Sequence, residues 1–227
     1  MTLIDNLISS NWLKTPRIIE AFKKIKRIDF LPEEMKELSE LNEALPIGYG
    51  QTISQPLVVA FMLELLQSQP GEKILDVGSG SGWTSALLAE IVGGGGKVIA
   101  IEVIPELMEF GKKNIGKYNF IQKGIVECLC ADGSKGYNKE APFDKILASA
   151  SVHPHTNGAL RFAQKNNGAP SGVGAREIPL AWKEQLKIGG RIVTPIGNSI
   201  WSFDKIVEKE FEEKEYPGFV FVPLIEK

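Results

Sequence analysis

The stretch that decides the fold reads Lys73-Ile74-Leu75-Asp76-Val77-Gly78-Ser79-Gly80-Ser81-Gly82-Trp83. It opens with a short apolar run typical of a buried strand, and a helical pattern begins at its last residue and continues to Val92. The glycines between them allow a tight turn and let backbone amides approach a bound molecule closely. A strand, a glycine turn and a helix in this order indicate a ligand-binding loop rather than a plain turn.

The chain beyond this loop alternates short apolar strands with helices. We expect helices over Glu106–Tyr118 and Ile178–Leu186, and strands over Lys97–Glu102, Gly124–Cys130, Phe143–Ala148 and Arg191–Pro195. Two more strands, Ile200–Glu208 and Gly218–Pro223, are expected as an antiparallel C-terminal hairpin. Alternating strands and helices predict an α/β fold, here a doubly wound, mostly parallel seven-stranded sheet of Rossmann-like type.

The residues before the glycine loop form a predicted N-terminal helical extension. Apolar residues recur at helical spacing from Leu3 and again from Ile18, and Thr15-Pro16 is a good helix start. A short helix is expected to restart within Phe30–Glu34, Leu45–Tyr49 is expected to be an extended link, and Pro56–Leu66 is helical in pattern. We therefore expect one domain over 1–227, with residues 1–70 as an extension on the substrate side of a core over 71–227.

One segment breaks the alternation. Val152–Arg176 is rich in glycine, proline and asparagine and has no sustained periodicity. A composition of this kind cannot bury a core, so we expect a flexible, inert insertion. It leaves the edge of the sheet at which ligands bind in such folds, which keeps a lid or a partner-binding role open.

Composition excludes several classes of protein. The 227 residues carry a net charge of −2, so no overall basic field attracts nucleic acid or acidic membranes. No apolar run approaches the ~20 residues that span a bilayer, and the N-terminus lacks a signal-peptide pattern. Cys128 and Cys130 are poorly spaced for a disulfide, and His153 and His155 lie far from any acidic cluster. We expect a cytoplasmic monomer with no metal site that binds neither nucleic acid nor membrane.

Three acidic residues follow or end the predicted strands. Asp76 precedes the glycines, Glu102 ends the next strand, and Asp132 follows the third in Ala131-Asp132-Gly133. A carboxylate such as Glu102 can accept hydrogen bonds from both hydroxyls of an adenosine ribose. The glycines run G-x-G-x-G, and Asp76 is a poor neighbour for pyrophosphate but a natural one for the cationic S-adenosylmethionine. Asp132 fits the adenine amine, or alternatively a turn or helix cap.

These residues match the class I methyltransferase pattern, and further segments narrow the match. The most specific of them reads Pro46-Ile47-Gly48-Tyr49-Gly50-Gln51-Thr52-Ile53-Ser54-Gln55-Pro56. With this segment the chain resembles the protein-L-isoaspartate O-methyltransferases, their archaeal members in particular, over nearly its whole length. The other similar segments are Leu13–Arg17, Phe30–Pro32, Asp132-Gly133, Ala141–Asp144, Ser149–Ser151, Glu177–Pro179, Gln185–Arg191 and Phe221–Leu224.

The resemblance implies an enzyme that transfers a methyl group from S-adenosylmethionine to the free α-carboxylate of L-isoaspartyl residues in damaged proteins and peptides. It implies a catalytic role for Ser54, with Thr52 and Ile53 also binding substrate. The positions that it implies for the cofactor are Asp76, Gly78, Ser79, Gly80, Glu102, Val103, Asp132 and Gly133. Capping of the helix that begins at Pro56 is an alternative role for Ser54.

Two other functions are compatible with part of the pattern. A class I methyltransferase for a small molecule or RNA would keep the glycine loop and Glu102, but it has no reason to contain the segment from Gly48 to Pro56. A non-catalytic methyltransferase-like adaptor is the second alternative. The intact acidic residues and Ser54 disfavour it, whereas the insertion keeps it open.

Overall fold

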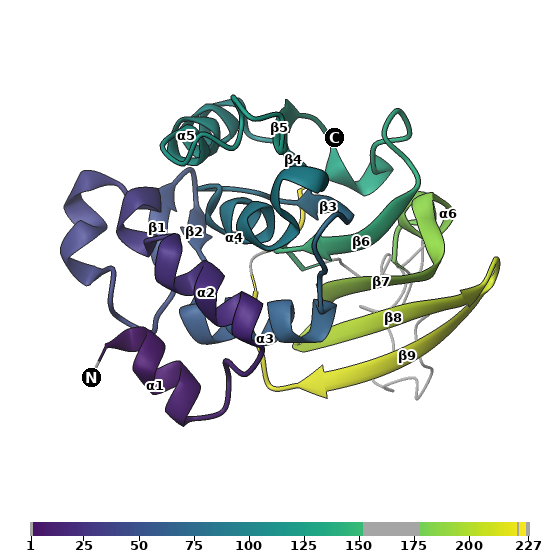
Figure 1. Ribbon diagram of the computed structural model, residues 1–227, viewed down its shortest axis with the longest axis horizontal. Helices are drawn as coiled ribbons and strands as arrows, with labels where there is room; N and C mark the ends of the chain where they lie inside the picture. Colours follow the sequence, from purple (N-terminus) through teal and green to yellow (C-terminus); the bar gives the residue numbers. More distant parts are fainter. Residues whose placement is uncertain (1, 152–177, 222, 226–227) are drawn as a thin grey trace, which may run out of the picture.

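The computed structural model describes residues 2–151, 178–221 and 223–225, which form a twisted sheet with helices packed on it (Figure 1). The strands of the main sheet lie in the order β5-β4-β3-β6-β7-β8-β9. These strands are β3 (Lys73–Val77), β4 (Lys97–Glu102), β5 (Val126–Cys130), β6 (Phe143–Ala148), β7 (Leu186–Ile196), β8 (Ser199–Val207) and β9 (Glu210–Pro217). The helices are α1 (Leu3–Ser9), α2 (Pro16–Lys24), α3 (Pro56–Leu66), α4 (Trp83–Val92), α5 (Pro105–Gly116) and α6 (Leu180–Gln185).

The central strands are parallel and buried on both faces. Strand β3 lies between β4 and β6, and both pairings are parallel. Alternate residues of β3 point to opposite faces. Ile74 joins the core under α2 to α5, whereas Leu75 and Val77 join the core under α6. This arrangement directs the carboxyl ends of β3, β4 and β6 to one edge, where the glycine loop begins.

The N-terminal extension lies on the same side of the sheet as α4. Helix α2 packs on α4, and the ring of Phe22 meets that of Trp83 edge-on at 5.6 Å between centroids. Two 3-10 turns, Arg27–Phe30 and Glu33–Leu38, then lead to the hairpin of β1 (Leu45–Gly48) and β2 (Gln51–Ile53). The extension therefore places this hairpin at the carboxyl edge of the main sheet.

The predicted fold class is confirmed. The seven strands are mostly parallel, with antiparallel strands β8 and β9 at the C-terminal end. The predicted bounds of Pro56–Leu66, Lys73–Val77, Trp83–Val92, Lys97–Glu102 and Phe143–Ala148 coincide with those in the structure. These segments have strong apolar patterns and are bounded by glycine or proline. The secondary structure that their local sequence favours is therefore the one that they adopt in the folded protein.

The predicted second strand of the C-terminal hairpin is wrong. The partner of β8 is β9, Glu210–Pro217, and not Gly218–Pro223. Strand β9 is an edge strand that faces solvent on both sides, so its sequence is charged and lacks the apolar run expected of a strand. The apolar residues that follow it pack elsewhere, since the ring of Phe219 stacks on that of Phe61 at 5.3 Å.

Other boundaries also differ from the prediction. Leu45–Tyr49 is part of a β-hairpin rather than an extended link, with Tyr49 at its tip in the left-handed region at φ 55°. The short helix expected near Phe30–Glu34 is a pair of 3-10 turns. Strand β7 begins at Leu186, directly after α6, and not at the predicted Arg191. The predicted insertion Val152–Arg176 lies outside the described residues.

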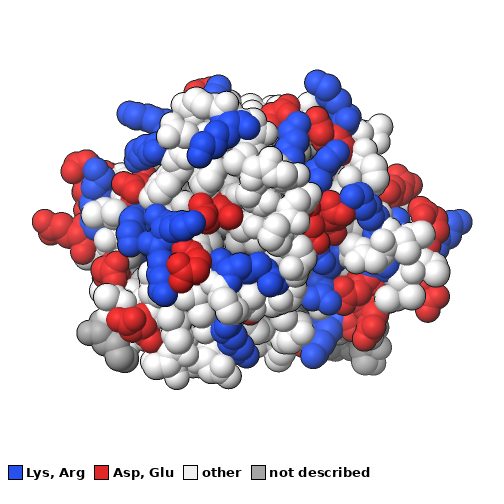
Figure 2. All heavy atoms as spheres, in the orientation of Figure 1, with Lys and Arg blue, Asp and Glu red and all other residues white. Residues whose placement is uncertain are grey.

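The face of the molecule in Figure 2 shows no strong separation of charge. Lysine and arginine side chains are interspersed with aspartate and glutamate over the face in Figure 2, as the net charge of −2 leads one to expect. Among residues 2–151, 178–221 and 223–225, no helix combines the length and apolar character needed to cross a membrane. The same part of the chain holds no group of three His, Cys, Asp or Glu side chains that could bind a metal.

Candidate active site

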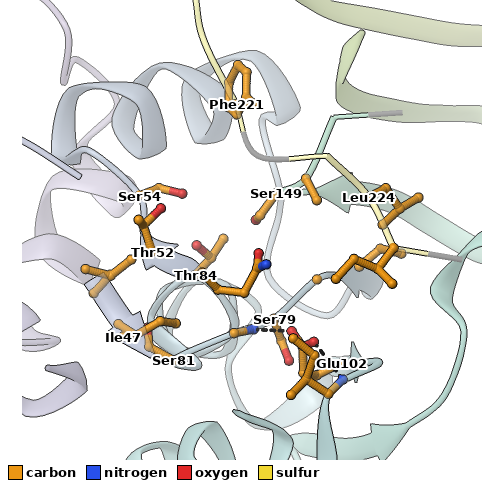
Figure 3. Close-up of a pocket in the computed structure, with 18 of the residues that line it drawn as sticks. Ile47, Thr52, Ser54, Ser79, Ser81, Thr84, Glu102, Ser149, Phe221 and Leu224 are labelled. Atoms are coloured by element: carbon orange, nitrogen blue, oxygen red, sulfur yellow. Dashed lines mark hydrogen bonds between the residues drawn. The ribbon is translucent and has the colours of Figure 1, made fainter. Parts of the chain in front are cut away.

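A cavity of about 340 Å³ opens at the carboxyl ends of β3, β4 and β6. One wall is the β1–β2 hairpin with Thr52, Ile53 and Ser54, and another is the glycine loop with Glu102 (Figure 3). The C-terminal residues Phe221 and Leu224 lie along its rim. Clefts at this edge of a doubly wound sheet are the usual ligand sites of such folds.

Glu102 holds the glycine loop in place. Its Oε2 accepts a hydrogen bond from the amide of Gly80 at 2.9 Å, and its Oε1 accepts from the amides of Val103 and Ile104 at 2.9 and 3.0 Å. The amides of Gly78 and Ser79 donate to the carbonyl of Ile101. Each carboxylate oxygen has two lone-pair sites, so Oε2 keeps capacity for a hydroxyl in the cavity.

The loop needs glycine where helix α5 approaches it. Gly82 has φ 84°, and a Cβ there would lie 2.8 Å from the carbonyl oxygen of Gly111. A Cβ on Gly111 would lie 2.6 Å from the carbonyl oxygen of Gly80. Gly111 thus allows α5 to pack closely on the glycine loop. No sequence pattern indicated this role, because Gly111 lies within a helical pattern.

Asp76 lies behind the glycine loop rather than on the cavity surface. It is fully buried, and the hydroxyl of Ser85 donates to its Oδ2 at 2.5 Å. Its Oδ1 has no hydrogen-bond partner among the described residues. Burial raises the pKa of Asp76 to about 7, the Ser85 hydrogen bond opposes this, and the negative charge of Glu102 adds to it. Such a carboxyl changes charge easily near neutral pH.

Asp132 forms a turn, in line with the second of the two interpretations of its sequence context. Its Oδ1 accepts from the amide and hydroxyl of Ser134 at 3.0 and 2.7 Å, and its Oδ2 pairs with Lys135 at 3.1 Å. Its neighbours Ala131 and Gly133 line the cavity, whereas Asp132 and Asp76 are not among the described lining residues. Asp132 therefore shapes this wall through its loop.

Ser54 does not cap helix α3, so that alternative is wrong. The N-cap is Gln55, with Pro56 as the first helical residue, and Gln55 makes no side-chain capping bond. The amide of Leu57 instead donates to the side chain of Asn42 at 2.9 Å. The Ser54 hydroxyl makes no hydrogen bond with another described residue and is directed into the cavity in Figure 3. A free hydroxyl on a cavity wall is available to a ligand.

Comparisons with known proteins show the family of this chain. The model of the family described as "Protein-L-isoaspartate(D-aspartate) O-methyltransferase (PCMT)" matches residues 1–168 and 167–227. This chain belongs to that family. A protein-L-isoaspartate O-methyltransferase of Methanopyrus kandleri is 38% identical over 98% of this chain and 89% of its own length. A relative from Archaeoglobus fulgidus, protein-L-isoaspartate O-methyltransferase 2, is 42% identical over 92% of this chain and 84% of its own.

A solved structure shares the fold of the methyltransferase domain. A putative family member from Plasmodium falciparum, in complex with S-adenosyl-L-homocysteine, has a TM-score of 0.79 and 20% identity. The alignment covers 99% of this chain and 97% of that one. Family membership confirms the sequence prediction of an S-adenosylmethionine-dependent protein-L-isoaspartate O-methyltransferase.

Several cavity residues were not predicted as site residues. Trp83 and Thr84 open helix α4, Ser149 follows β6, and Phe221 and Leu224 come from the C-terminal segment. This segment reaches the cavity because the amide of Leu224 donates to the carbonyl of Ser151 at 2.8 Å. The sequence offered one sign of their role, because the segments Ser149–Ser151 and Phe221–Leu224 are among those that resemble the family.

The raised pKa of Asp76 predicts a pH dependence of stability. A carboxyl whose pKa is about 7 when folded, against an ordinary 3.8, favours the folded state below pH ~4. This contribution is lost as the pH rises through ~7. Because Asp76→Asn keeps the side chain neutral, we expect its free energy of unfolding to rise relative to wild type between pH ~4 and ~7. Urea denaturation at several pH values measures the difference, and a constant difference over this range would contradict the buried, neutral Asp76.

Proposed function

We propose that the cavity holds S-adenosylmethionine against the glycine loop and an L-isoaspartyl carboxylate against Ser54. The observation that supports this most is that Glu102 and the unpartnered Ser54 hydroxyl line opposite walls of the same cavity. Its volume of about 340 Å³ falls within the range of small-ligand sites. The proposal places the two reactants side by side.

The residues of the loop fit this cofactor. We assign its ribose to Glu102, since Oε2 has lone-pair capacity beyond its bond to Gly80. Asp76 offers a buried oxygen without a partner, which suits a nearby positive charge or a bridging water. Gly78, Ser79, Gly80 and Val103 line the loop side, and the Asp132–Gly133 turn is assigned to the adenine side. When bound, the cofactor supplies an electrophilic methyl group on a sulfonium.

The protein's own contribution is mainly positioning. A free α-carboxylate has a pKa of about 3.3–3.7, so it is ionised at neutral pH and needs no general base. The Ser54 hydroxyl would donate a hydrogen bond to one carboxylate oxygen and leave the other oxygen free to accept the methyl group that the bound cofactor would supply. Thr52 and Ile53 border the same wall. The rate acceleration would come mainly from holding the substrate carboxylate in the right position and direction relative to the methyl group of the cofactor.

We further propose that the protein repairs isoaspartyl-damaged proteins as a monomer of one domain in the cytoplasm. The described cysteines, Cys128 and Cys130, are both free thiols, which suits a reducing compartment. Thr52 and Ser54 of the hairpin wall and Phe221 and Leu224 of the C-terminal rim border the same cavity, and the proposal requires an isoaspartyl segment of another protein to enter between them (Figure 3).

One assay tests the proposed function. The protein is incubated with methyl-labelled S-adenosylmethionine and an isoaspartyl peptide, with the matching aspartyl peptide as control. We expect label only in the isoaspartyl peptide, and its release as methanol by mild base, because the product is a methyl ester. Equal labelling of both peptides, base-stable label, or no transfer by folded protein would refute the proposal. The last outcome would favour the adaptor.

A further inference from the structure

A buried arginine lies directly behind the Ser54 wall. Arg27 follows α2 and is only 6% exposed. Its guanidinium donates to four main-chain carbonyls, those of Ser39 (3.2 Å), Leu41 (3.0 Å), Glu43 (2.7 Å) and Ser54 (3.3 Å). It therefore ties the residue proposed for catalysis to the segment 39–43.

Among the described residues, no carboxylate pairs with the charge of Arg27. Arg27 makes no ion pair with the residues that the structure describes, and Glu40 acts on it only at longer range. Burial lowers the pKa of Arg27 to about 10, which still leaves it cationic at neutral pH. Burying a cation without a carboxylate is costly, and its hydrogen bonds offset that cost only while all four carbonyls stay in place. These four bonds therefore hold the segment 39–43 and the main chain of Ser54 together.

Arg27 also contacts a second wall of the cavity. Its Cζ lies 5.5 Å from the ring centroid of Trp83, which lines the cavity at the start of α4. The guanidinium thus spans the hairpin side and the glycine-loop side of the site. A lysine could not replace it, because an ammonium is a point donor whereas the planar guanidinium has five donors in a fixed fork.

We propose that Arg27 is a positioning residue that fixes the main chain of Ser54, and thereby the direction of its hydroxyl toward the substrate carboxylate. This inference rests on the proposed function of Ser54. It assigns Arg27 no contact with substrate or cofactor, since it is not among the described residues that line the cavity.

The decisive experiment is a double-mutant cycle with isoaspartyl peptide as substrate. We expect Arg27→Lys to lower kcat about fivefold, the effect of one typical hydrogen bond, with cofactor affinity near that of wild type. In the Ser54→Ala background the same substitution should have little further effect, because the hydroxyl that Arg27 positions is absent. A stability loss alone would leave kcat per folded molecule unchanged.

Arg17→Lys is the matched control. Arg17 lies on α2, and its guanidinium also holds the main chain, donating to the carbonyl of Ser68 at 2.7 Å and to the side chain of Gln67 at 2.9 Å. None of these three residues lines the cavity. We expect Arg17→Lys to leave kcat unchanged.

A second variant decides the matter if Arg27→Lys fails to fold. Asn42 is half-buried and provides another tether, since its carbonyl accepts from Gln55 at 2.8 Å and its side chain accepts from the amide of Leu57 at 2.9 Å. Asn42→Ala should lower kcat about twofold, again only when Ser54 is present. It releases the same segment without removing a buried charge.

The outcomes separate this inference from the proposed function. A wild-type protein without methyl transfer to isoaspartyl peptide would overturn both. With active wild-type protein, an unchanged kcat in folded Arg27→Lys, or an equal fall with and without the Ser54 hydroxyl, would overturn the positioning role alone. If Arg27→Lys does not fold, the positioning role would be overturned by an unchanged kcat in Asn42→Ala, or by an equal fall in kcat with and without the Ser54 hydroxyl.

Discussion

Ser54→Ala is expected to lower kcat for an isoaspartyl peptide by at least about tenfold, while S-adenosylmethionine affinity stays near that of wild type. A hydrogen bond to a charged carboxylate contributes about 1.5–3 kcal/mol, and the Ser54 hydroxyl is the donor proposed for it. The substitution removes no hydrogen bond to another described residue, and Gln55 rather than Ser54 caps α3. The fold should therefore remain unchanged.

Steady-state kinetics and calorimetric titration of the cofactor separate the two effects. Ser9→Ala is a suitable control, because Ser9 lies on α1 and, among the described residues, its hydroxyl bonds only to the carbonyl of Asn6 at 3.1 Å. Ser54→Thr keeps a hydroxyl and should recover part of the rate. An unchanged rate in Ser54→Ala would show that the hydroxyl does not act on the substrate.

Glu102→Ala is expected to weaken S-adenosylmethionine binding by at least about tenfold, since each charge-assisted hydrogen bond contributes about 1.5–3 kcal/mol. The structure adds a second reason to the proposed ribose contact. The carboxylate accepts from the amides of Gly80, Val103 and Ile104, so its removal also releases the glycine loop from the end of β4. Both losses reduce affinity in the same direction.

Calorimetric titration measures this affinity, and circular dichroism checks that the sheet persists. Glu90→Ala is the control. Glu90 lies on α4, does not line the cavity, and pairs with Lys24 at an N–O distance of 2.5 Å. The Glu90→Ala variant should bind the cofactor as wild type does. Equal affinity of Glu102→Ala and wild type would refute the assignment of Glu102 to the cofactor.

The sequence determined the order of the elements and the location of Ser54 and Glu102 at the edge of the sheet where the cavity opens. Lys73–Val77 and Trp83–Val92 have local patterns that match their final environment, so their bounds follow from apolar spacing and glycine alone. The specific segment around Ser54 and the position of Glu102 at a strand end placed both residues at the same edge of the sheet. Parallel strands make this inference possible, because their carboxyl ends meet at one edge.

Only the tertiary structure decided how these residues are supported. The burial of Asp76 was not predicted, because it comes from alternation along β3, which turns the side chain toward Ser85 on α4, where burial raises its pKa. Strand β9 was missed because an exposed edge strand has no apolar run. Arg27 gave no signal, since its partners are main-chain carbonyls, which every residue has. Contacts of this kind depend on where distant segments meet, and side-chain patterns do not encode that.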